Sequence, residues 1–252
     1  MFMRFAQIPV RPEAVEAYTS FYNYRIGPAL SEVPGCLFAR LIQESSAEMD
    51  AGLLSFTVWD SAEAAEAYQQ SPLFKQLIDD HEPFAEDTRE WKIQLTEDNR
   101  LEYKPVIVDP AVQAVPVVGG LKEGDPAKQI GDFTYIRILS ATLDSNKLED
   151  VEKLYDEQIA PRLMEFDGCR GAYLIALNDK VDVLSVSVWE SKRHADLYDE
   201  DVLSSELWNL AKPYMSSLLQ WKMSLHPDDR TETTTSDDRS IKGYNIVTGE
   251  KA

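Results

Sequence analysis

The feature that most constrains the fold of this chain is an internal repeat within its 252 residues. At one offset Arg4 falls on Arg137 and Gly35 falls on Gly168. Further along the chain, matching residues are separated by an offset three residues shorter, and the Val-Trp pair at 58–59 falls on the Val-Trp pair at 188–189. Self-similarity of this kind is the signature of a chain built from repeated structural units. The sequence therefore predicts a tandem duplication of one α+β module.

Each copy reads as a series of strands and helices. In the first copy, alternating apolar residues predict a strand at 3–10, and apolar residues three and four apart predict a helix after it. Two further strands are expected at 37–43 and 53–59. They should pair as a hairpin, because the matching turn of the second copy, 178–180, is only three residues long. A second helix and a last strand follow, so the order is β-α-β-β-α-β, the ferredoxin-like pattern.

The last strand of each copy is expected at a tryptophan, Trp91 in the first copy and Trp221 in the second. A four-stranded sheet of this type has helices on one face only, so its other face needs an apolar partner. Two copies in one chain can press those faces together. We therefore expect an α+β fold in which two ferredoxin-like modules form an intramolecular dimeric α+β barrel, a pseudo-dimer that can be monomeric.

The predicted organisation has four segments. The modules are expected at 1–95 and 133–225. Between them, 96–132 contains prolines and glycines interleaved with valines, which favours an extended linker across the surface. The segment 226–252 is polar and threonine-rich, which is typical of a tail. Both an ordered and a disordered state of this tail stay open.

Charge and composition exclude several classes of partner. The formal net charge is −19, so the surface repels phosphate backbones and anionic membranes, and no nucleic-acid partner is expected. No apolar run has the length of a membrane helix. The first ten residues lack the features of a signal peptide, so a cytoplasmic location is the default expectation. Cys36 and Cys169 fall on equivalent places, which favours buried thiols over a bridge between the copies.

Two matching motifs carry a family resemblance. The third strand of the first copy ends in VWDS at 58–61 and is followed by Tyr68, and the second copy has VWES at 188–191 followed by Tyr198. With the order of elements, these motifs resemble the antibiotic biosynthesis monooxygenase family of dimeric α+β barrels. The resemblance covers both copies. Family members form homodimers, so it implies that this chain is a covalent version of such a dimer.

The same resemblance implies several functions. Some members are oxygenases without a cofactor that bind an electron-rich aromatic substrate between helices and sheet, and others degrade haem. The haem-degrading members place their iron-binding histidine where this sequence has Ile78 and Trp208, and His81 lies one turn further along. We expect a monooxygenase acting on a small hydrophobic aromatic or quinol-like substrate without a bound cofactor. A non-catalytic small-molecule-binding or stress-related barrel is the main alternative, and a haem protein is a third.

The candidate site residues are the aromatic, histidine and arginine side chains that the repeat places near such a pocket. The catalytic candidates are Tyr68, Tyr198 and His194. The substrate-binding candidates are Tyr22, Tyr155, Trp59, Trp189, Trp208, Arg4 and Arg137.

Each candidate has a structural alternative. Core packing explains the tryptophans and the buried tyrosines, ion pairs at the barrel seam explain the arginines, and a surface position explains His194. His194 and Trp208 make the second copy the stronger candidate for a working pocket. No metal site is expected, because neighbouring residues of the acidic run at 79–82 point in different directions on a helix.

Overall fold

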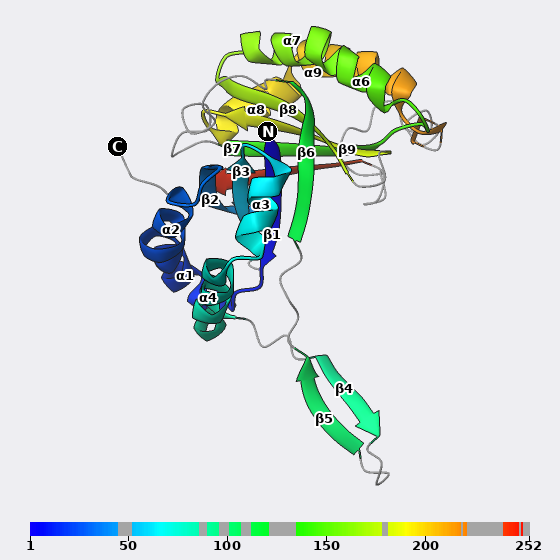
Figure 1. The fold of residues 1–252 in the computed structure, drawn as a ribbon. Helices are drawn as coiled ribbons and strands as arrows, with labels where there is room; N and C mark the ends of the chain where they lie inside the picture. Colours follow the sequence, from blue (N-terminus) through cyan, green and yellow to red (C-terminus); the bar gives the residue numbers. More distant parts are fainter. Residues whose placement is uncertain are drawn as a thin grey trace.

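The computed structural model describes residues 1–44, 52–85, 90–95, 101–106, 112–120, 135–177, 181–217, 219–220, 239–246 and 248. Its centre is a closed barrel of antiparallel strands (Figure 1). Around the barrel the strands follow the order β1 (Phe2–Ile8), β3 (Leu53–Trp59), β2 (Cys36–Glu44), β10 (Arg239–Ile246), β7 (Tyr135–Thr142), β9 (Asp182–Trp189), β8 (Cys169–Ala176) and β6 (Val112–Gly120). Closure leaves no strand edge exposed in the barrel.

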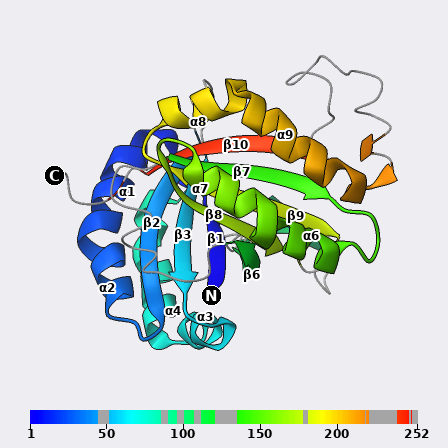
Figure 2. The same ribbon diagram turned by 90° about the horizontal axis from the view of Figure 1, so that it is seen from above.

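Helices cover the outside of the barrel, and those of the two halves lie over different faces (Figures 1 and 2). The first half contributes α1 (Val15–Phe21), α2 (Gly27–Ser31), α3 (Ala62–Gln69) and α4 (Pro72–His81). The second half contributes α6 (Leu148–Leu154), α7 (Ala160–Glu165), α8 (Lys192–Glu200) and α9 (Val202–Ala211). Short 3-10 turns η1 (Pro12–Ala14), η3 (Glu82–Phe84) and η5 (Lys212–Tyr214) adjoin them. The fold is α+β and ferredoxin-like, as the sequence predicts. Among the described helices, none is long and apolar enough to cross a membrane.

The first helix of each half contains a proline, a residue that usually kinks or ends a helix. Instead, a π-helical turn precedes each proline, η2 (Tyr22–Ile26) before Pro28 and η4 (Tyr155–Ile159) before Pro161. The wider turn lets Gly27 N–H donate to the Tyr22 carbonyl five residues back. A proline lacks the N–H that a regular helix would need at this point, so the local widening lets the helix continue.

Three apolar layers hold the molecule together. The barrel interior is filled from both halves, with Met3, Phe56 and Val58 on one side and Ile136 and Val188 on the other. In each half, one further layer lies between the sheet and the helices that cover it. The two sheets therefore bury their bare faces against each other. This is the arrangement expected for a pair of ferredoxin-like modules in one chain.

The predicted hairpin pairs are confirmed, but the prediction for the last strand of the first copy is wrong. Strands β2 and β3 pair, as do β8 and β9. Trp91 lies in β4 (Glu90–Leu95), which pairs with β5 (Leu101–Val106) outside the barrel (Figure 1). Strand β6 takes the place beside β1. Trp221 lies outside the described residues.

Strands β6 and β10 come from the segments predicted as a linker and a polar tail. Each bridges the halves: β6 pairs with β1 and β8, and β10 pairs with β7 and β2. In the sequence, 112–120 is expected to belong to an extended linker, and 239–246 to a polar tail whose order stays open. A strand between two others is held by backbone hydrogen bonds, which a polar side chain does not prevent.

Candidate functional site

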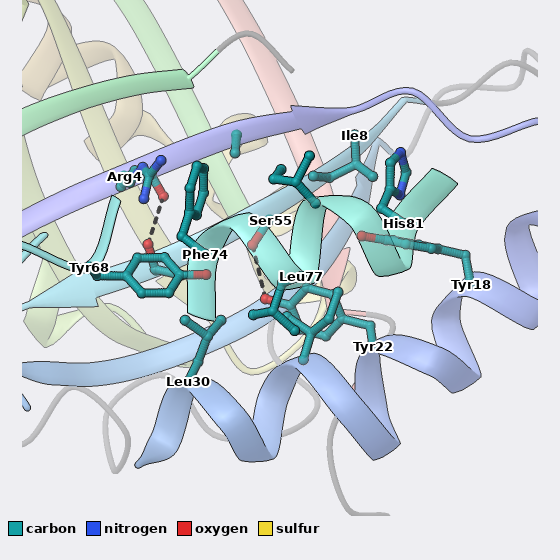
Figure 3. A pocket seen from close by; sticks show the side chains of 14 residues that line it. Arg4, Ile8, Tyr18, Tyr22, Leu30, Ser55, Tyr68, Phe74, Leu77 and His81 are labelled. Atoms are coloured by element: carbon teal, nitrogen blue, oxygen red, sulfur yellow. Dashed lines mark hydrogen bonds between the residues drawn. The ribbon is translucent and has the colours of Figure 1, made fainter. Parts of the chain in front are cut away.

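Each half of the molecule contains one small pocket between its helices and the outer face of its sheet, with a volume of about 70 Å³ in both cases. The first pocket is lined by Arg4, Ala6, Ile8, Tyr18, Tyr22, Ile26, Leu30, Ser55, Thr57, Tyr68, Phe74, Leu77, Ile78 and His81 (Figure 3). The second is lined by Arg137, Leu139, Ala141, Val151, Tyr155, Ile159, Leu163, Leu174, Val183, Ser185, Ser187, Tyr198, Ser204, Leu207, Trp208, Ala211 and Met215.

Strand alternation decides which side chains reach the first pocket. Along β1, Met3 and Phe5 belong to the barrel interior, whereas Arg4, Ala6 and Ile8 line the pocket. Successive side chains of a strand point to opposite faces, so the face away from the barrel interior meets the helices. The strand thus supplies a charged residue to a layer whose other side chains are apolar or uncharged and polar.

Tyr22 and Tyr155 lie in the two π-helical turns and line their pockets. The Tyr22 hydroxyl is hydrogen-bonded to Ser55 Oγ at 2.9 Å, and the Tyr155 hydroxyl to Ser185 Oγ at 3.0 Å. Burial raises the pKa of both phenols well above the ordinary value. Each hydroxyl therefore stays protonated and fixed at the pocket wall.

Tyr68 and Tyr198 come from α3 and α8 and line the same two pockets. Burial raises the pKa of Tyr68 to about 12, although the nearby Arg4 guanidinium opposes the shift. Burial also raises the pKa of Tyr198, against the effect of Arg137. Phenols in this state serve as neutral hydrogen-bond donors rather than as bases.

Trp59 and Trp189 stand behind these tyrosines and do not line the pockets. The Trp59 ring stacks on Tyr68 at 5.2 Å, and the Trp189 ring stacks on Tyr198 at 5.1 Å. Both indoles are fully buried. Their N–H groups donate to hydroxyl groups on their own strands, Thr57 and Ser187, each at 2.9 Å. Their position is therefore one of support for the tyrosine rings.

Arg4 and Arg137 occupy matching places but have different partners. Arg137 forms an ion pair with Asp199, in which Nη2 donates to Oδ1 at 2.7 Å and Nε to Oδ2 at 3.3 Å. Arg4 Nε and Nη2 are buried and have no hydrogen-bond partner. Its guanidinium lies 5.8 Å from the centre of the Tyr68 ring and 5.2 Å from that of Phe74. Arg137 thus has an ion pair, but the pair joins β7 to α8 of the same half and does not cross the barrel seam as expected.

His81 and Tyr18 are pocket residues that the sequence analysis did not select. The His81 ring meets the Tyr18 ring edge-on at 5.1 Å, at the end of the pocket away from Arg4 (Figure 3). Burial lowers the pKa of His81, with a smaller opposing effect from the Pro9 carbonyl. The imidazole is therefore neutral at physiological pH. A signal was present in the sequence, because His81 follows the buried Leu77 by four residues and so shares its helix face.

His194 does not reach the second pocket. Its Nδ1 is hydrogen-bonded to Ser191 Oγ at 2.9 Å at the start of α8, and its ring lies against Gly168. Trp208 does line that pocket, at the place that Ile78 has in the first. The structure thus brings together the selected tyrosines and arginines, adds Trp208 in one half, and separates His194 from them.

Both cysteines are free thiols, and burial raises the pKa of each to about 11, so neither is a reactive thiolate. Within the ranges that the structure describes, no cluster of histidine, cysteine or acidic residues could hold a metal ion. The chemically distinctive groups of the described pockets are therefore tyrosines, arginines and His81.

Comparison with known proteins agrees with the α+β fold. Residues 1–80 match the model of the antibiotic biosynthesis monooxygenase (ABM) family, so this part of the chain is an ABM domain. It contains β1, β2, β3, the helices of the first half up to residue 80, and every residue that lines the first pocket except His81. No curated protein matches the chain.

Solved structures extend the similarity over nearly the whole chain. A candidate monooxygenase from Fusobacterium nucleatum superposes with a TM-score of 0.63 at 7% identity, covering 98% of this chain and 92% of that one. A candidate monooxygenase from Lactobacillus acidophilus gives 0.59 at 8%, covering 96% and 92%. An anthrone oxidase-like protein gives 0.52 at 13%, covering 97% and 90%. At such low identity these matches establish the shared fold.

Proposed function

We propose that this chain is an ABM-type monooxygenase that oxidises a small aromatic or quinol-like substrate in its first pocket without a bound cofactor. One observation carries the proposal: an apolar cavity whose wall combines the hydroxyls of Tyr18, Tyr22 and Tyr68 with the neutral imidazole of His81. Such a wall can take a proton from a bound substrate and hold the resulting anion. The ABM match over residues 1–80 supports the same reading.

We also infer that the chain arose by duplication and that its halves have diverged. Matching tyrosine–serine bonds, stacked tryptophans and π-helical turns support this inference. The differences concern chemistry: Val151 and Ala211 stand in the second half where Tyr18 and His81 stand in the first. In the sequence, His194 and Trp208 favour the second pocket; Trp208 lines that pocket, but His194 does not reach it. We therefore assign catalysis to the first.

The reaction we propose converts an activated methylene or phenol carbon to a carbonyl. His81 accepts a proton from the substrate, and the substrate anion gives one electron to O₂. The two radicals then combine to form a C–O bond, and the peroxide loses water with return of the proton. For a methylene the balance is R₂CH₂ + O₂ → R₂C=O + H₂O, so the substrate supplies all the electrons. The tyrosine hydroxyls orient the substrate by donating to its oxygen atoms.

The size of the pocket places a condition on substrate entry. Its volume of about 70 Å³ is roughly half that of a cavity of about 150 Å³ known to bind benzene. An aromatic substrate therefore requires side chains at the pocket wall to move aside. A non-catalytic barrel that holds a small apolar molecule is the competing function, and it would need no base at the pocket end.

The test is oxygen consumption with anthrone and with 1,4-dihydroxynaphthalene, followed by mass spectrometry of the product formed under ¹⁸O₂. We expect one ¹⁸O atom in the ketone formed from anthrone, and loss of a positioned base should lower the rate by about 10²–10⁴-fold. His81→Gln should show that loss. His194→Gln is the matched control, because it removes a histidine outside the lining of either pocket.

Three results would contradict the proposal. They are no oxygen uptake above that of heat-denatured protein, product without ¹⁸O, and equal activity of the two histidine variants. The last result would move the chemistry away from His81. The first, with substrate still bound, would favour the non-catalytic barrel.

A further inference from the structure

Arg4 is a charged side chain enclosed in an apolar layer. It is only 4% exposed. Two of its nitrogens, Nε and Nη2, have no hydrogen-bond partner. Burial lowers its pKa, which reflects the energetic penalty on the buried charge. Buried polar groups are almost always satisfied in folded proteins, so an exception of this kind needs an explanation.

The surroundings of Arg4 leave its charge uncompensated. The guanidinium faces the rings of Tyr68 and Phe74. In the part of the chain that the structure describes, no carboxylate forms an ion pair with it. The residue that follows Tyr68 is Gln69, an uncharged amide. The rings give partial compensation, because aromatic faces attract cations, but they do not accept the two N–H groups in the way a carboxylate does.

The second half shows the arrangement that Arg4 lacks. Asp199 follows Tyr198 there, and both of its oxygens accept hydrogen bonds from Arg137. The donors are Nε and Nη2, the same two atoms that are free in Arg4. These atoms form one edge of the guanidinium and match the spacing of two carboxylate oxygens. The carboxylate that completes this site is part of the protein in one half and missing in the other.

We infer that the first pocket is a binding site for an aromatic carboxylate and that Arg4 selects it through a two-point interaction at Nε and Nη2. The carboxylate takes the role that Asp199 has in the second half, and the ring of the ligand lies beside Phe74 and Tyr68, at the Arg4 end of the pocket (Figure 3). The second pocket does not select anions, since Asp199 already neutralises Arg137. The inference rests on the proposed function only in placing the ligand in the same pocket.

The test compares benzoate with benzamide, which has nearly the same shape without the charge. Binding to the full chain is measured by isothermal titration calorimetry in low-chloride buffer, without oxygen turnover. Hydrogen bonds to a charged group should make benzoate bind about 10–100-fold more tightly than benzamide. Arg4→Gln should abolish this preference. Arg4→Lys should restore only part of it, because an ammonium keeps the charge and loses the planar fork.

A matched control separates the site from the general charge of the protein. Arg162→Gln removes one positive charge from an exposed ion pair in the second half and should keep the full preference. Far-ultraviolet circular dichroism verifies that each variant is folded. Acetate, an anion without a ring, should bind much more weakly than benzoate.

The inference is overturned if benzoate and benzamide bind equally, if neither binds, or if the preference survives Arg4→Gln. It is also overturned if Arg137→Gln, rather than Arg4→Gln, removes the preference. Because benzoate has no oxidisable position of the proposed kind, its binding is independent of oxygenase chemistry. Preference for benzoate without any oxygen uptake would leave the anion site standing and remove the proposed function.

Discussion

Replacement of Arg4 by methionine should stabilise the protein, although it removes the proposed ligand-binding group. A buried donor without a partner costs about 1–3 kcal/mol, and Arg4 has two such donors. The variant loses the contacts of the guanidinium with Tyr68 and Phe74, which are worth about 0.5–2 kcal/mol each. Methionine keeps an apolar stem of similar length. The balance favours the variant by about 1–2 kcal/mol.

The same substitution at Arg137 should have the opposite sign. There it removes two hydrogen bonds to Asp199, of a kind worth about 1.5–3 kcal/mol. The Asp199 side chain is 39% exposed, so water partly solvates the carboxylate that is left. We therefore expect Arg137→Met to destabilise the protein by about 1–2 kcal/mol.

Urea denaturation monitored by tryptophan fluorescence measures both variants against the parent protein. The midpoint should rise for Arg4→Met and fall for Arg137→Met. In thermal unfolding, 1 kcal/mol corresponds to about 2–4 °C for a protein of this size. If Arg4→Met lowers the midpoint as much as Arg137→Met does, Arg4 is a structural residue. The argument that its buried charge is kept for a ligand would then fail.

Two further predictions concern the histidines. Burial lowers the pKa of His81, so the unfolded chain binds a proton more readily than the folded protein, and stability should decline as the pH falls below about 6.5. Thermal unfolding at pH 7.5 and 5.5 should show a smaller decline for His81→Gln than for the parent protein. An equal decline would contradict a buried neutral imidazole. Gly168 has φ +79° and its Cβ would lie 2.3 Å from His194 Cγ, so Gly168→Ala should cost about 2–4 kcal/mol. Adding His194→Ala removes the imidazole ring but keeps Cβ, which would lie 2.7 Å from the new methyl group, so part of the loss should be recovered. No recovery in urea denaturation would show that the contact with the ring is unimportant.

The repeat made much of the fold predictable, because each element could be checked against its counterpart. Strand pairs, the ferredoxin-like order and the barrel arrangement follow from patterns that are local or repeated. The strand that completes each sheet could not be predicted from these patterns. Trp91 lies in a segment of alternating apolar and polar residues and was the nearest candidate for the last strand of the first copy. Strands β6 and β10 are instead specified by the strands with which they pair in the barrel. Pairing with residues far along the chain leaves little trace in local composition.

The candidate site shows the same division. Pocket residues on predicted strands and helices, such as Tyr22 and Arg4, could be selected because periodicity indicates which face they occupy. His81 stands in the acidic run at 79–82 and was not selected, although its spacing from Leu77 puts it on the buried face of its helix. The different environments of Arg4 and Arg137 depend on whether an acidic residue follows the pocket tyrosine of α3 or α8. Only the tertiary structure brings that acid to the arginine.

The position of β10 has a consequence for the order in which the molecule is assembled. This strand pairs through Ile246 with Ile42 of the first half and through Arg239 with Ala141 of the second. The segment 239–246 leaves the ribosome after the seven other barrel strands, so β2 and β7 each keep one edge unpaired until it arrives. Contacts between such distant residues form late and slowly, because a long loop must close first. Barrel closure through β10 therefore follows the synthesis of the other barrel strands, and it joins the sheets of the two halves along this edge.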